Sequence, residues 1–385
     1  MADHAYDIVL FGASGFTGAL TAEYLAAHLP AGSRLALAGR DRARLESLRD
    51  RLGVDAGLIT ADVADERSMR GMAEATRVVA STVGPYVRHG EPLVAACAAA
   101  GTDYVDLTGE PEFLDLMYLR HHDTAVRTGA RLVHACGIEA IPADLGALFT
   151  VEQLPGGEPI RIRGYLSARG RASGGTVDTL LMTAGRRRSA ATAHRDRRRV
   201  EPVDPARRIR GVAGRPGYER DVRAWVVPLP TIDHHIVLRS ARGDERYGPD
   251  FSYSHFGALR SPVRAAALVA GTAAVLTLAR FGPTRRALRR LLTSGSGPTA
   301  EQRARSWFRL RFLAERGDRR IVTQVSGADP GYGETAKMLA ESALCLAHDP
   351  LPETAGQVTT ALAMGGTLRR RLETAGIRFD ALSAE

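Results

Sequence analysis

The sequence predicts an α/β protein with a doubly wound parallel sheet at the N-terminus, followed by a second, α+β domain. Short apolar runs alternate with longer amphipathic stretches through the first third of the 385 residues. Continuous apolar strands joined by helices are typical of a parallel sheet that is covered on both faces. Near Leu154 this alternation stops and strand-like runs follow one another, which indicates a change of domain.

The expected elements of the first domain follow in order along the chain. Strands are predicted over residues 6–11, 34–38, 57–61, 78–82, 104–107 and 131–135. Helices are predicted over residues 16–29, 42–52 and 92–100. Each helix is followed by a stop signal, namely Pro30, Gly53 or Gly101. These alternating elements predict a first domain over residues 1–154.

The second domain is expected over residues 155–328, with strands that pair in the antiparallel manner. Its strands are predicted over residues 160–167, 233–239, 251–256, 307–315 and 319–326. The last two are separated by Arg316, Gly317 and Asp318, which is typical of a hairpin turn. The C-terminal segment, 329–385, contains an apolar-faced helix over 335–347, which we expect to pack back on the first domain.

Composition excludes several classes of protein. The chain has 52 Lys and Arg against 43 Asp and Glu, a net charge of +9, and 44% hydrophobic residues. This apolar content is normal for a globular protein and excludes wholesale disorder and a polytopic membrane protein. The 3 cysteines form no CxxC pair, which argues against a disulfide scaffold and a structural zinc site. The N-terminus lacks the basic and apolar regions of a signal peptide, so we expect a cytoplasmic protein.

The basic charge is concentrated in one segment. Residues 186–223, the Arg-rich insert, contain 13 Arg and 5 acidic residues. Because large apolar residues are scarce there, we expect a long solvated loop within the second domain. The insert would also suit docking of an acidic carrier protein or of anionic lipid head groups, and both stay open. Aromatic residues in and next to the insert are limited to Tyr218 and Trp225, so we expect no nucleic-acid binding.

An apolar segment lies near residue 270. Residues 265–279 contain no charge and are bracketed by Arg264 and Arg280. As a helix the segment would be about 22 Å long, which is short of the roughly 30 Å of a bilayer's hydrocarbon core, so a membrane span is not expected. A core helix of the second domain, an interfacial helix with snorkelling arginines and one wall of an apolar tunnel are the open alternatives.

The turn after the first predicted strand has glycines at the spacing G-x-x-G-x-x-G. The turn comprises Gly12, Ser14, Gly15, Phe16, Thr17 and Gly18. Gly12 allows a tight turn, Gly15 allows the backbone to approach a diphosphate, and Gly18 allows close packing of strand and helix. The amino end of the following helix would add N–H donors and a positive dipole end. The pattern predicts a Rossmann domain that binds a dinucleotide.

The end of the second predicted strand indicates which dinucleotide is bound. Arg40 stands where an NAD-specific site places a carboxylate for the ribose 2′-OH, and its guanidinium suits a 2′-phosphate instead. Asp41 is expected to cap the next helix and to point elsewhere. NADPH is therefore predicted over NADH. Asp62 and Val63, after the third strand, are expected to flank the adenine, with capping of its own loop by Asp62 as an equal alternative.

The turn after the fourth predicted strand, Thr82 to Tyr86, is expected to run under the nicotinamide ribose, because ligands lie outside the carboxyl ends of such strands. Gly84 and Pro85 make this turn rigid. Tyr86 and His89 would then face the cleft, and they are the leading candidates for the proton donor. Packing of the Tyr86 ring and a loop hydrogen bond of His89 are the structural alternatives.

A second group of polar residues follows the sixth predicted strand. It comprises His134, Cys136, Glu139 and Asp144. Cys136 beside a histidine would permit thiol-based reduction, although a buried structural thiol is favoured. Glu139 and Asp144 also suit capping of the next helix. The Tyr-x-x-x-Lys signature of short-chain dehydrogenases is excluded, because the single lysine, Lys337, has Gly333 four positions before it.

No metal site is predicted. His121 and His122 are neighbours on a predicted helix and project in different directions. His234 and His235 fall on a predicted strand, where neighbouring side chains point to opposite faces. Neither pair is spaced to bind one metal ion together.

With these residues in view, the chain resembles the saccharopine dehydrogenase-like oxidoreductases, and within them the trans-acting enoyl reductase group. The matching stretches are FGASGFTG (11–18), LAGR (37–40), VGPYVRHGEPLVAACAAAGTDYVDLTGE (83–110), HACGIEAIPADLG (134–146), GGT (174–176) and DPGYGETAKMLAESALCLA (329–347). The chain departs from the family pattern at Glu139 and Ala140, which stand in place of Asp and Ser, and at residues 355–360, where the C-terminal motif is degraded.

The resemblance implies a nicotinamide-dependent reductase whose substrate, in the trans-acting group, is an unsaturated acyl or polyketide chain presented by a separate synthase. We therefore expect NADPH-dependent reduction of a C=C bond in a long apolar acyl, polyketide or isoprenoid-like substrate. An imine or amino-acid reductase of the saccharopine type is the alternative enzyme. A lipid-associated nucleotide-binding protein without catalysis is the non-enzymatic alternative, and a peripheral place at the membrane stays open.

Overall fold

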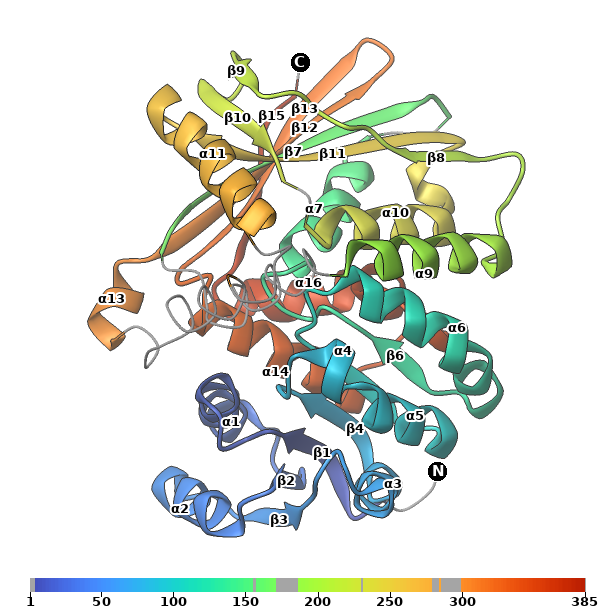
Figure 1. Ribbon diagram of the computed structural model, residues 1–385, viewed down its shortest axis with the longest axis vertical. Helices are drawn as coiled ribbons and strands as arrows, with labels where there is room; N and C mark the ends of the chain where they lie inside the picture. The colour runs from blue at the N-terminus through green and yellow to red at the C-terminus, as the bar shows by residue number, and fades with distance from the viewer. Residues whose placement is uncertain are drawn as a thin grey trace. The chain divides into compact units, whose positions relative to one another are not determined.

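The computed structural model describes residues 4–154, 157–170, 186–229, 231–278, 284 and 299–384. Internal contacts divide the chain into two compact units. The first unit contains Met1–Glu139, Ala193–Arg199 and Tyr332–Ala375, and the second contains Ala140–Thr192, Val200–Gly331 and Gly376–Glu385. Each unit is built around its own sheet (Figure 1).

The described residues of the first unit form a seven-stranded, fully parallel sheet with the order β14-β6-β5-β4-β1-β2-β3. Its strands are β1 (Tyr6–Phe11), β2 (Leu35–Gly39), β3 (Ala56–Thr60), β4 (Thr76–Ser81), β5 (Asp103–Asp106), β6 (Arg131–Val133) and β14 (Gly356–Val358). The predicted doubly wound sheet is confirmed. Because the strand order reverses between β1 and β4, the carboxyl ends of these two strands flank the crevice where such sheets bind ligands.

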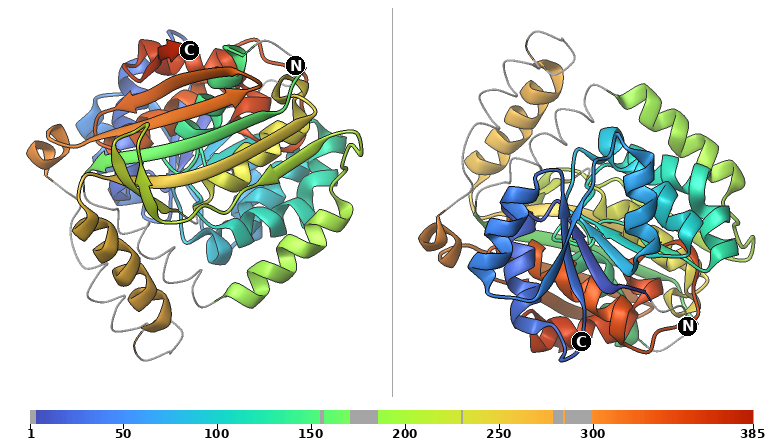
Figure 2. Two further views of the ribbon diagram at one scale, coloured as in Figure 1. Left: turned by 90° about the horizontal axis from the view of Figure 1, so that it is seen from above. Right: turned by 90° about the horizontal axis from the view of Figure 1, so that it is seen from below.

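Helices cover both faces of this parallel sheet (Figure 2). They are α1 (Phe16–His28), α2 (Arg42–Leu52), α3 (Glu66–Glu74), α4 (Tyr86–His89), α5 (Glu91–Ala100), α6 (Pro111–Thr128), α14 (Gly333–His348), α15 (Thr360–Ala363) and α16 (Gly365–Thr374). Helices α3, α5 and α6 pack side by side, and α14 packs beside α1 and against β4 and β5. The apolar spacing of residues 335–347 thus places a C-terminal helix on the sheet built by the N-terminal residues.

The described residues of the second unit form an eight-stranded sheet, with the path β15-β13-β12-β7-β11-β10-β9 and with β8 paired to β11. Its strands are β7 (Ile160–Arg169), β8 (Arg208–Gly211), β9 (Gly217–Glu219), β10 (Ala224–Pro228), β11 (Asp250–Leu259), β12 (Trp307–Arg316), β13 (Arg319–Gly327) and β15 (Arg378–Ala384). The predicted hairpin between β12 and β13 is confirmed. The expected antiparallel pairing holds for β11 with β10 and is wrong for β11 with β7 and with β8, to both of which it runs parallel.

One predicted strand of the second unit is wrong. Residues 233–239 belong to the helix α10 (Asp233–Gly243). The run Ile236-Val237-Leu238 is apolar in either structure, and a short apolar run does not distinguish a strand from a helix. The helical spacing of the buried residues Asp233, Ile236, Val237 and Ser240 becomes evident only because α10 packs on β11 and β8.

The boundary between the units lies earlier than the sequence predicts. Residues 140–154, which we expected in the first domain, group with the second unit. They form α7 (Ile141–Glu152), which is buried on almost all sides and packs against β12, β13 and α10. At the other end, β15 pairs with β13 and therefore belongs to the second unit too.

The Arg-rich insert is not a plain solvated loop. It contains the helix α9 (Arg187–Val200) and the strands β8 and β9. Within the first unit, Arg197 is buried: its guanidinium lies 2.9 Å from Asp115 Oδ1 of α6 and 4.5 Å from the ring centre of Tyr118. The Asp115 carboxylate and the face of the Tyr118 ring compensate the loss of hydration of the buried guanidinium, so Arg197 has a structural role.

The apolar segment forms most of α11 (Pro262–Leu278), whereas Ala279 lies outside the described residues. The alternative of a core helix is wrong, because most residues of α11 are exposed, and among those whose burial the structure describes only Ala265 is buried. In the described part of the chain, no helix combines the length and the apolar character needed to cross a membrane.

Candidate functional site

The turn after β1 has the conformation that its glycines predict. Gly12 has φ of +84°, in the left-handed region that favours glycine. A Cβ atom there would lie 2.7 Å from both Thr82 Oγ1 and Val83 Cγ2, which belong to the loop after β4. Both the backbone angle and the close approach of this loop therefore require glycine.

The start of α1 is open to a ligand. Gly18 is buried, and a Cβ atom on it would overlap the carbonyl oxygen of Gly12, so strand and helix pack as closely as predicted. Gly15 occupies the N-cap position and has no side chain to bond the first N–H groups of the helix. Ser14, Gly15 and Phe16 are exposed. Uncapped N–H groups and the positive end of the helix dipole make this turn suited to a diphosphate.

The remaining residues of the turn have structural contacts. The ring of Phe16 lies edge-on to that of Tyr332, with 4.8 Å between the ring centres. Thr17 is half-buried, and its carbonyl oxygen accepts a hydrogen bond from the Thr21 hydroxyl at 2.9 Å. Thr82 donates its hydroxyl to the carbonyl oxygens of Phe11 and Gly12 at 3.2 and 3.1 Å. Thr82 thereby ties the loop after β4 to the glycine turn.

Arg40 and Asp41 follow the carboxyl end of β2. Asp41 caps α2 as predicted, because its Oδ1 accepts a hydrogen bond from the main-chain N–H of Arg44 at 3.1 Å. Arg40 is exposed, and among the described residues its guanidinium forms no hydrogen bond or ion pair. A guanidinium with free N–H donors near the end of β2 could bind a 2′-phosphate through charge-assisted hydrogen bonds.

Asp62 and Val63, which were expected to flank the adenine, make local structural contacts. The carboxylate of Asp62 accepts a hydrogen bond from the N–H of Ala64 at 3.0 Å, which is the capping alternative. Val63 is half-buried and packs against the apolar core of the first unit. The structure therefore favours a structural role for Asp62.

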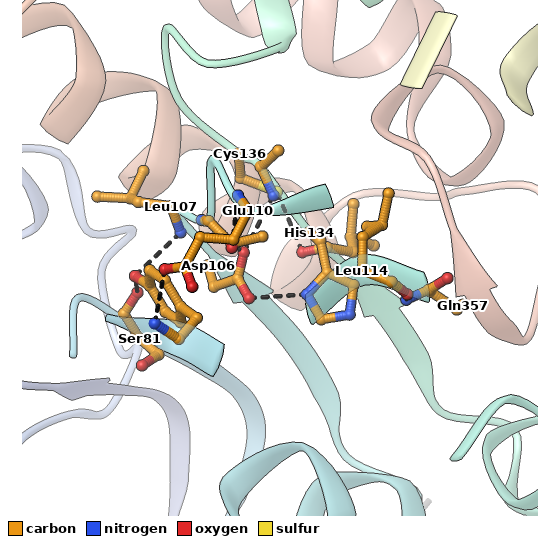
Figure 3. Close-up of polar contacts among 12 residues, drawn as sticks. Ser81, Asp106, Leu107, Glu110, Leu114, His134, Cys136 and Gln357 are labelled. Atoms are coloured by element: carbon orange, nitrogen blue, oxygen red, sulfur yellow. Dashed lines mark hydrogen bonds and ion pairs between the residues drawn. The ribbon is translucent and has the colours of Figure 1, made fainter. Parts of the chain in front are cut away.

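Tyr86 does not face a cleft, and this prediction is wrong. Its side chain is only 5% exposed, beside the ring of Phe113. Its hydroxyl donates to the carbonyl of Ser81 at 2.9 Å and accepts from the N–H of Leu107 at 3.2 Å (Figure 3). Burial raises the pKa of Tyr86 well above its ordinary value. The hydroxyl therefore joins the ends of β4 and β5 and is unsuited to proton delivery.

Glu110 is a residue of this site that the sequence analysis missed. Its two carboxylate oxygens accept hydrogen bonds from the main-chain N–H groups of Tyr86 at 2.8 Å and Val87 at 3.0 Å (Figure 3). Glu110 is buried, and desolvation raises its pKa although both N–H donors oppose that shift. The carboxylate thus fixes the start of α4 and the loop that contains Gly84 and Pro85, which are joined by a cis peptide bond.

His89 is the remaining candidate for the proton donor. It ends the short helix α4, and its main-chain N–H bonds the carbonyl of Pro85 at 3.1 Å. The side chain is half-buried, and the described contacts include no hydrogen bond to its imidazole, so they do not support the alternative of a loop hydrogen bond. Unlike the Tyr86 hydroxyl, this imidazole forms no described hydrogen bond with a main-chain group.

The polar residues after β6 divide into different roles. Asp106, at the end of β5, binds His134 Nδ1 through Oδ2 at 2.7 Å and the N–H groups of Thr108 and Ala135 through Oδ1 at 3.0 Å each (Figure 3). Both members of the Asp106–His134 pair are buried, and His134 Nε2 has no hydrogen-bond partner among the residues that the structure describes. Sequence spacing missed Asp106, because only the parallel pairing of β5 with β6 brings it to His134.

Cys136 is a buried structural thiol, as favoured from the sequence. Its Sγ donates to the carbonyl of Val133 at 3.4 Å, and burial raises its pKa well above the ordinary value. A neutral, enclosed thiol is a poor nucleophile, and the buried position of Cys136 argues against thiol-based reduction. Asp144 lies in the second unit, where it accepts a hydrogen bond from Ser240 at 2.5 Å. The predicted capping of α7 is wrong, because its N-cap is Ala140 without a side-chain bond.

One hollow of the first unit lies away from the glycine turn. It has a volume of about 600 Å³ and is lined by Arg77, Asp103 and Arg131 among other residues. These residues stand at the amino ends of β4, β5 and β6. Parallel sheets bind ligands at their carboxyl ends, so the glycine turn and not this hollow is the candidate site. Among the described residues, no cluster of His, Cys, Asp and Glu is arranged to hold a metal ion.

Comparison with known proteins agrees with this geometry. Residues 8–133 match the family model of the saccharopine dehydrogenase NADP-binding domain. Proteins named trans-acting enoyl reductase from Mycobacterium ulcerans and Mycobacterium tuberculosis are each 36% identical to this chain; the matches cover 99% and 98% of it and 98% and 97% of those proteins.

The fold has a counterpart among solved structures. Apo saccharopine dehydrogenase from Saccharomyces cerevisiae superimposes with a TM-score of 0.57 at 12% identity, over 98% of this chain and 100% of that one. At 12% identity this likeness shows the fold alone. The 36% identity to the mycobacterial proteins over nearly the full length shows the family: the chain belongs to the trans-acting enoyl reductases, with a saccharopine dehydrogenase-type NADP-binding domain in its first unit.

Proposed function

We propose that this NADP-dependent oxidoreductase reduces the C=C bond of an α,β-unsaturated acyl chain that is presented by a separate protein. The relatives at 36% identity over nearly the whole chain are named for enoyl reduction in trans. The matched NADP-binding domain supplies the reductant's site. A long apolar acyl, polyketide or isoprenoid-like chain is the substrate class that we assign.

The glycine turn is the observation that carries this proposal. Gly12 and Gly18 leave no room for a Cβ atom, and the exposed start of α1 at Gly15 is not capped by any side chain. We assign the diphosphate to the N–H groups of this turn, together with the hydroxyl of Ser14. Arg40 is assigned to the 2′-phosphate, which distinguishes NADPH from NADH.

The loop after β4 is assigned to the nicotinamide end of the cofactor. Thr82 anchors this loop to the glycine turn, and Glu110 anchors the following residues at the start of α4. NADPH supplies a hydride when bound at such a loop. The residues that follow Thr82, namely Gly84 and Pro85, would form the surface beneath the ring.

Reduction of an enoyl group adds a hydride to the β-carbon and a proton to the α-carbon, and the C=C bond becomes a single bond. The protein must therefore hold a proton source near the reacting carbons. We assign this role to His89, whose imidazole is half-buried at the end of α4 and takes no part in a described hydrogen bond. Imidazole is the most frequent general acid in enzymes.

The partner that presents the substrate is proposed to be an acidic carrier protein. On α9, Arg197 points to Asp115, whereas Arg195, Arg198 and Arg199 are exposed. Exposed arginines on one helix attract an acidic surface and orient its approach. The substitution of Arg195 and Arg198 by Gln should raise KM for a carrier-bound substrate and leave KM for a small thioester unchanged.

The test of the proposed function is NADPH consumption with a panel of substrates. Enoyl thioesters of increasing chain length should be reduced, with kcat/KM rising with chain length, and the product should be the saturated thioester. Imines and 2-keto acids form the second arm, and turnover only in this arm would overturn the proposal in favour of an imine reductase. NADPH binding without turnover of any substrate would leave a nucleotide-binding protein without catalysis.

A further inference from the structure

Helix α11 of the second unit is both apolar and exposed. Its sequence, PVRAAALVAGTAAVLTL, contains a single charged residue, Arg264. The exposed fractions are 74% for Val263, 38% for Leu268 and 42% for Val269. The helix touches β10 and β11 and extends beyond the edge of their sheet (Figure 2). Large apolar side chains in water are unfavourable, so α11 requires an apolar environment that the described chain does not supply.

The exposed side chains point in several directions around the helix. Successive residues of an α-helix are turned by about 100°, so Val263, Leu268 and Val269 stand on three different sides. A protein partner that docks on one face would cover one of these sides and leave the others in water. A helix that is apolar all round is stable where the medium surrounds it, as the interior of a lipid layer does.

The charge close to α11 in the sequence indicates the kind of lipid. The 50 residues from 251 to 300 contain 7 Arg and no Asp or Glu. Among the described ones, Arg260 and Arg264 are exposed at the start of the helix. Each basic residue near an anionic membrane contributes roughly 1 kcal/mol to binding, and arginine can reach head groups while its stem lies in the apolar layer.

The length of α11 sets how it can enter a bilayer. Its 17 residues measure about 25 Å, which is shorter than the roughly 30 Å of the hydrocarbon core. From the exposed, all-round apolar surface of α11 beside Arg260 and Arg264, we propose that α11 inserts from one side into the hydrocarbon layer of an anionic bilayer, without crossing it, and holds the protein at that surface. A long apolar acyl substrate of the proposed function would partition into the same layer.

Vesicle co-sedimentation of the full-length protein tests this proposal. Wild type should sediment with vesicles of phosphatidylglycerol and phosphatidylcholine and bind pure phosphatidylcholine vesicles more weakly. The double variant Leu268→Glu and Val269→Glu should weaken binding by about tenfold or more, because two charged carboxylates replace side chains that gain free energy on burial. A matched control is Val126→Glu on α6, where a similarly exposed valine (48%) should be replaced without effect.

A second variant separates charge from apolar insertion. Arg260→Gln together with Arg264→Gln should reduce binding to anionic vesicles and leave the weak binding to phosphatidylcholine unchanged. All substituted side chains are exposed, so thermal unfolding of the variants should match wild type. NADPH consumption with a small soluble thioester should also be unchanged, which keeps this test independent of the proposed function.

Three results would overturn the proposal. The first is wild-type protein that sediments with neither kind of vesicle. The second is a Leu268→Glu and Val269→Glu variant that binds vesicles as well as wild type does. The third is sedimentation velocity that shows a wild-type dimer and a monomer for this variant, without vesicle binding, which would assign α11 to the interface between two copies of the chain.

Discussion

The carboxylate of Glu110 accepts a hydrogen bond from the main-chain N–H of Tyr86 at 2.8 Å, across 24 positions of sequence. Its second oxygen accepts from Val87. One buried side chain therefore holds the start of α4, and with it the loop that we assign to the nicotinamide. The strength of this arrangement can be measured.

Replacement of Glu110 by Gln should destabilise the protein. The amide has one acceptor oxygen, and its NH₂ group would face a main-chain N–H, so one buried donor loses its partner at a cost of about 1–3 kcal/mol. Urea unfolding measures this loss. In the control Glu91→Gln, a half-exposed carboxylate that pairs with Arg120 and His121 is changed, and the cost should be below about 1 kcal/mol. Equal losses in both variants would contradict the structural role of Glu110.

Replacement of Gly18 by Ala should weaken both stability and NADPH binding. The new Cβ atom would overlap the carbonyl oxygen of Gly12, so α1 must move away from β1 and the glycine turn must open. In the control Gly71→Ala, a glycine of α3 has nothing within 4 Å of the new Cβ atom, and the change should stabilise by about 0.4–1 kcal/mol. Thermal unfolding without NADPH measures the stability of each variant, and the shift that NADPH causes measures its binding. Unchanged NADPH affinity in Gly18→Ala would contradict the assignment of the diphosphate to this turn.

Replacement of Arg40 by Ala should weaken NADPH binding by about tenfold to a hundredfold and leave NADH binding nearly unchanged, because a hydrogen bond to a charged group contributes about 1.5–3 kcal/mol. Calorimetric titration with both dinucleotides measures the difference. Arg44→Ala is the matched control, since this exposed arginine on α2 pairs with Asp41. If NADH binding weakens as much as NADPH binding, the 2′-phosphate is bound elsewhere.

Tyr86 and His89 should respond differently to substitution. Tyr86→Phe removes a hydroxyl that serves Ser81 and Leu107, so the free energy of unfolding should fall by about 1–3 kcal/mol while turnover is retained. His89→Gln should lower kcat by about a hundredfold or more and preserve NADPH affinity, as the loss of a general acid does. A Tyr86→Phe variant with normal stability and no turnover would restore Tyr86 as the proton donor.

The three cysteines should be unreactive in the native protein. Cys97, Cys136 and Cys345 are buried, and burial raises the pKa of each thiol. A higher pKa means less thiolate at any given pH, so alkylation at pH 8 should be slow until urea unfolds the chain. Cys136→Ala should retain turnover. Rapid native alkylation of Cys136 with loss of activity would reinstate a thiol mechanism.

Local signals were enough to predict much of the first unit. The glycine spacing after β1, the capping carboxylate of Asp41 and the stop signals at Gly53 and Gly101 act within a few residues, so the sequence alone predicted the turn and these helix boundaries. The short apolar runs likewise located six of the seven parallel strands of the first unit to within two residues, whereas β14, which joins the sheet from the C-terminal segment, was not predicted. In these cases the physical cause lies in neighbouring residues.

Long-range packing decided the rest. Residues 233–239 are apolar enough for either structure, and packing on β11 makes them a helix. Tyr86 is buried rather than facing a cleft because the ends of β4 and β5 bond its hydroxyl, and Glu110 acts on α4 across 24 positions of sequence.

The same apolar residues that suited a core helix form the exposed helix α11, because no described part of the second unit covers them. Composition and spacing therefore established a dinucleotide-binding α/β chain. Which side chains are buried, exposed or brought together followed only from tertiary packing, since burial and distant contacts depend on residues far apart in the sequence.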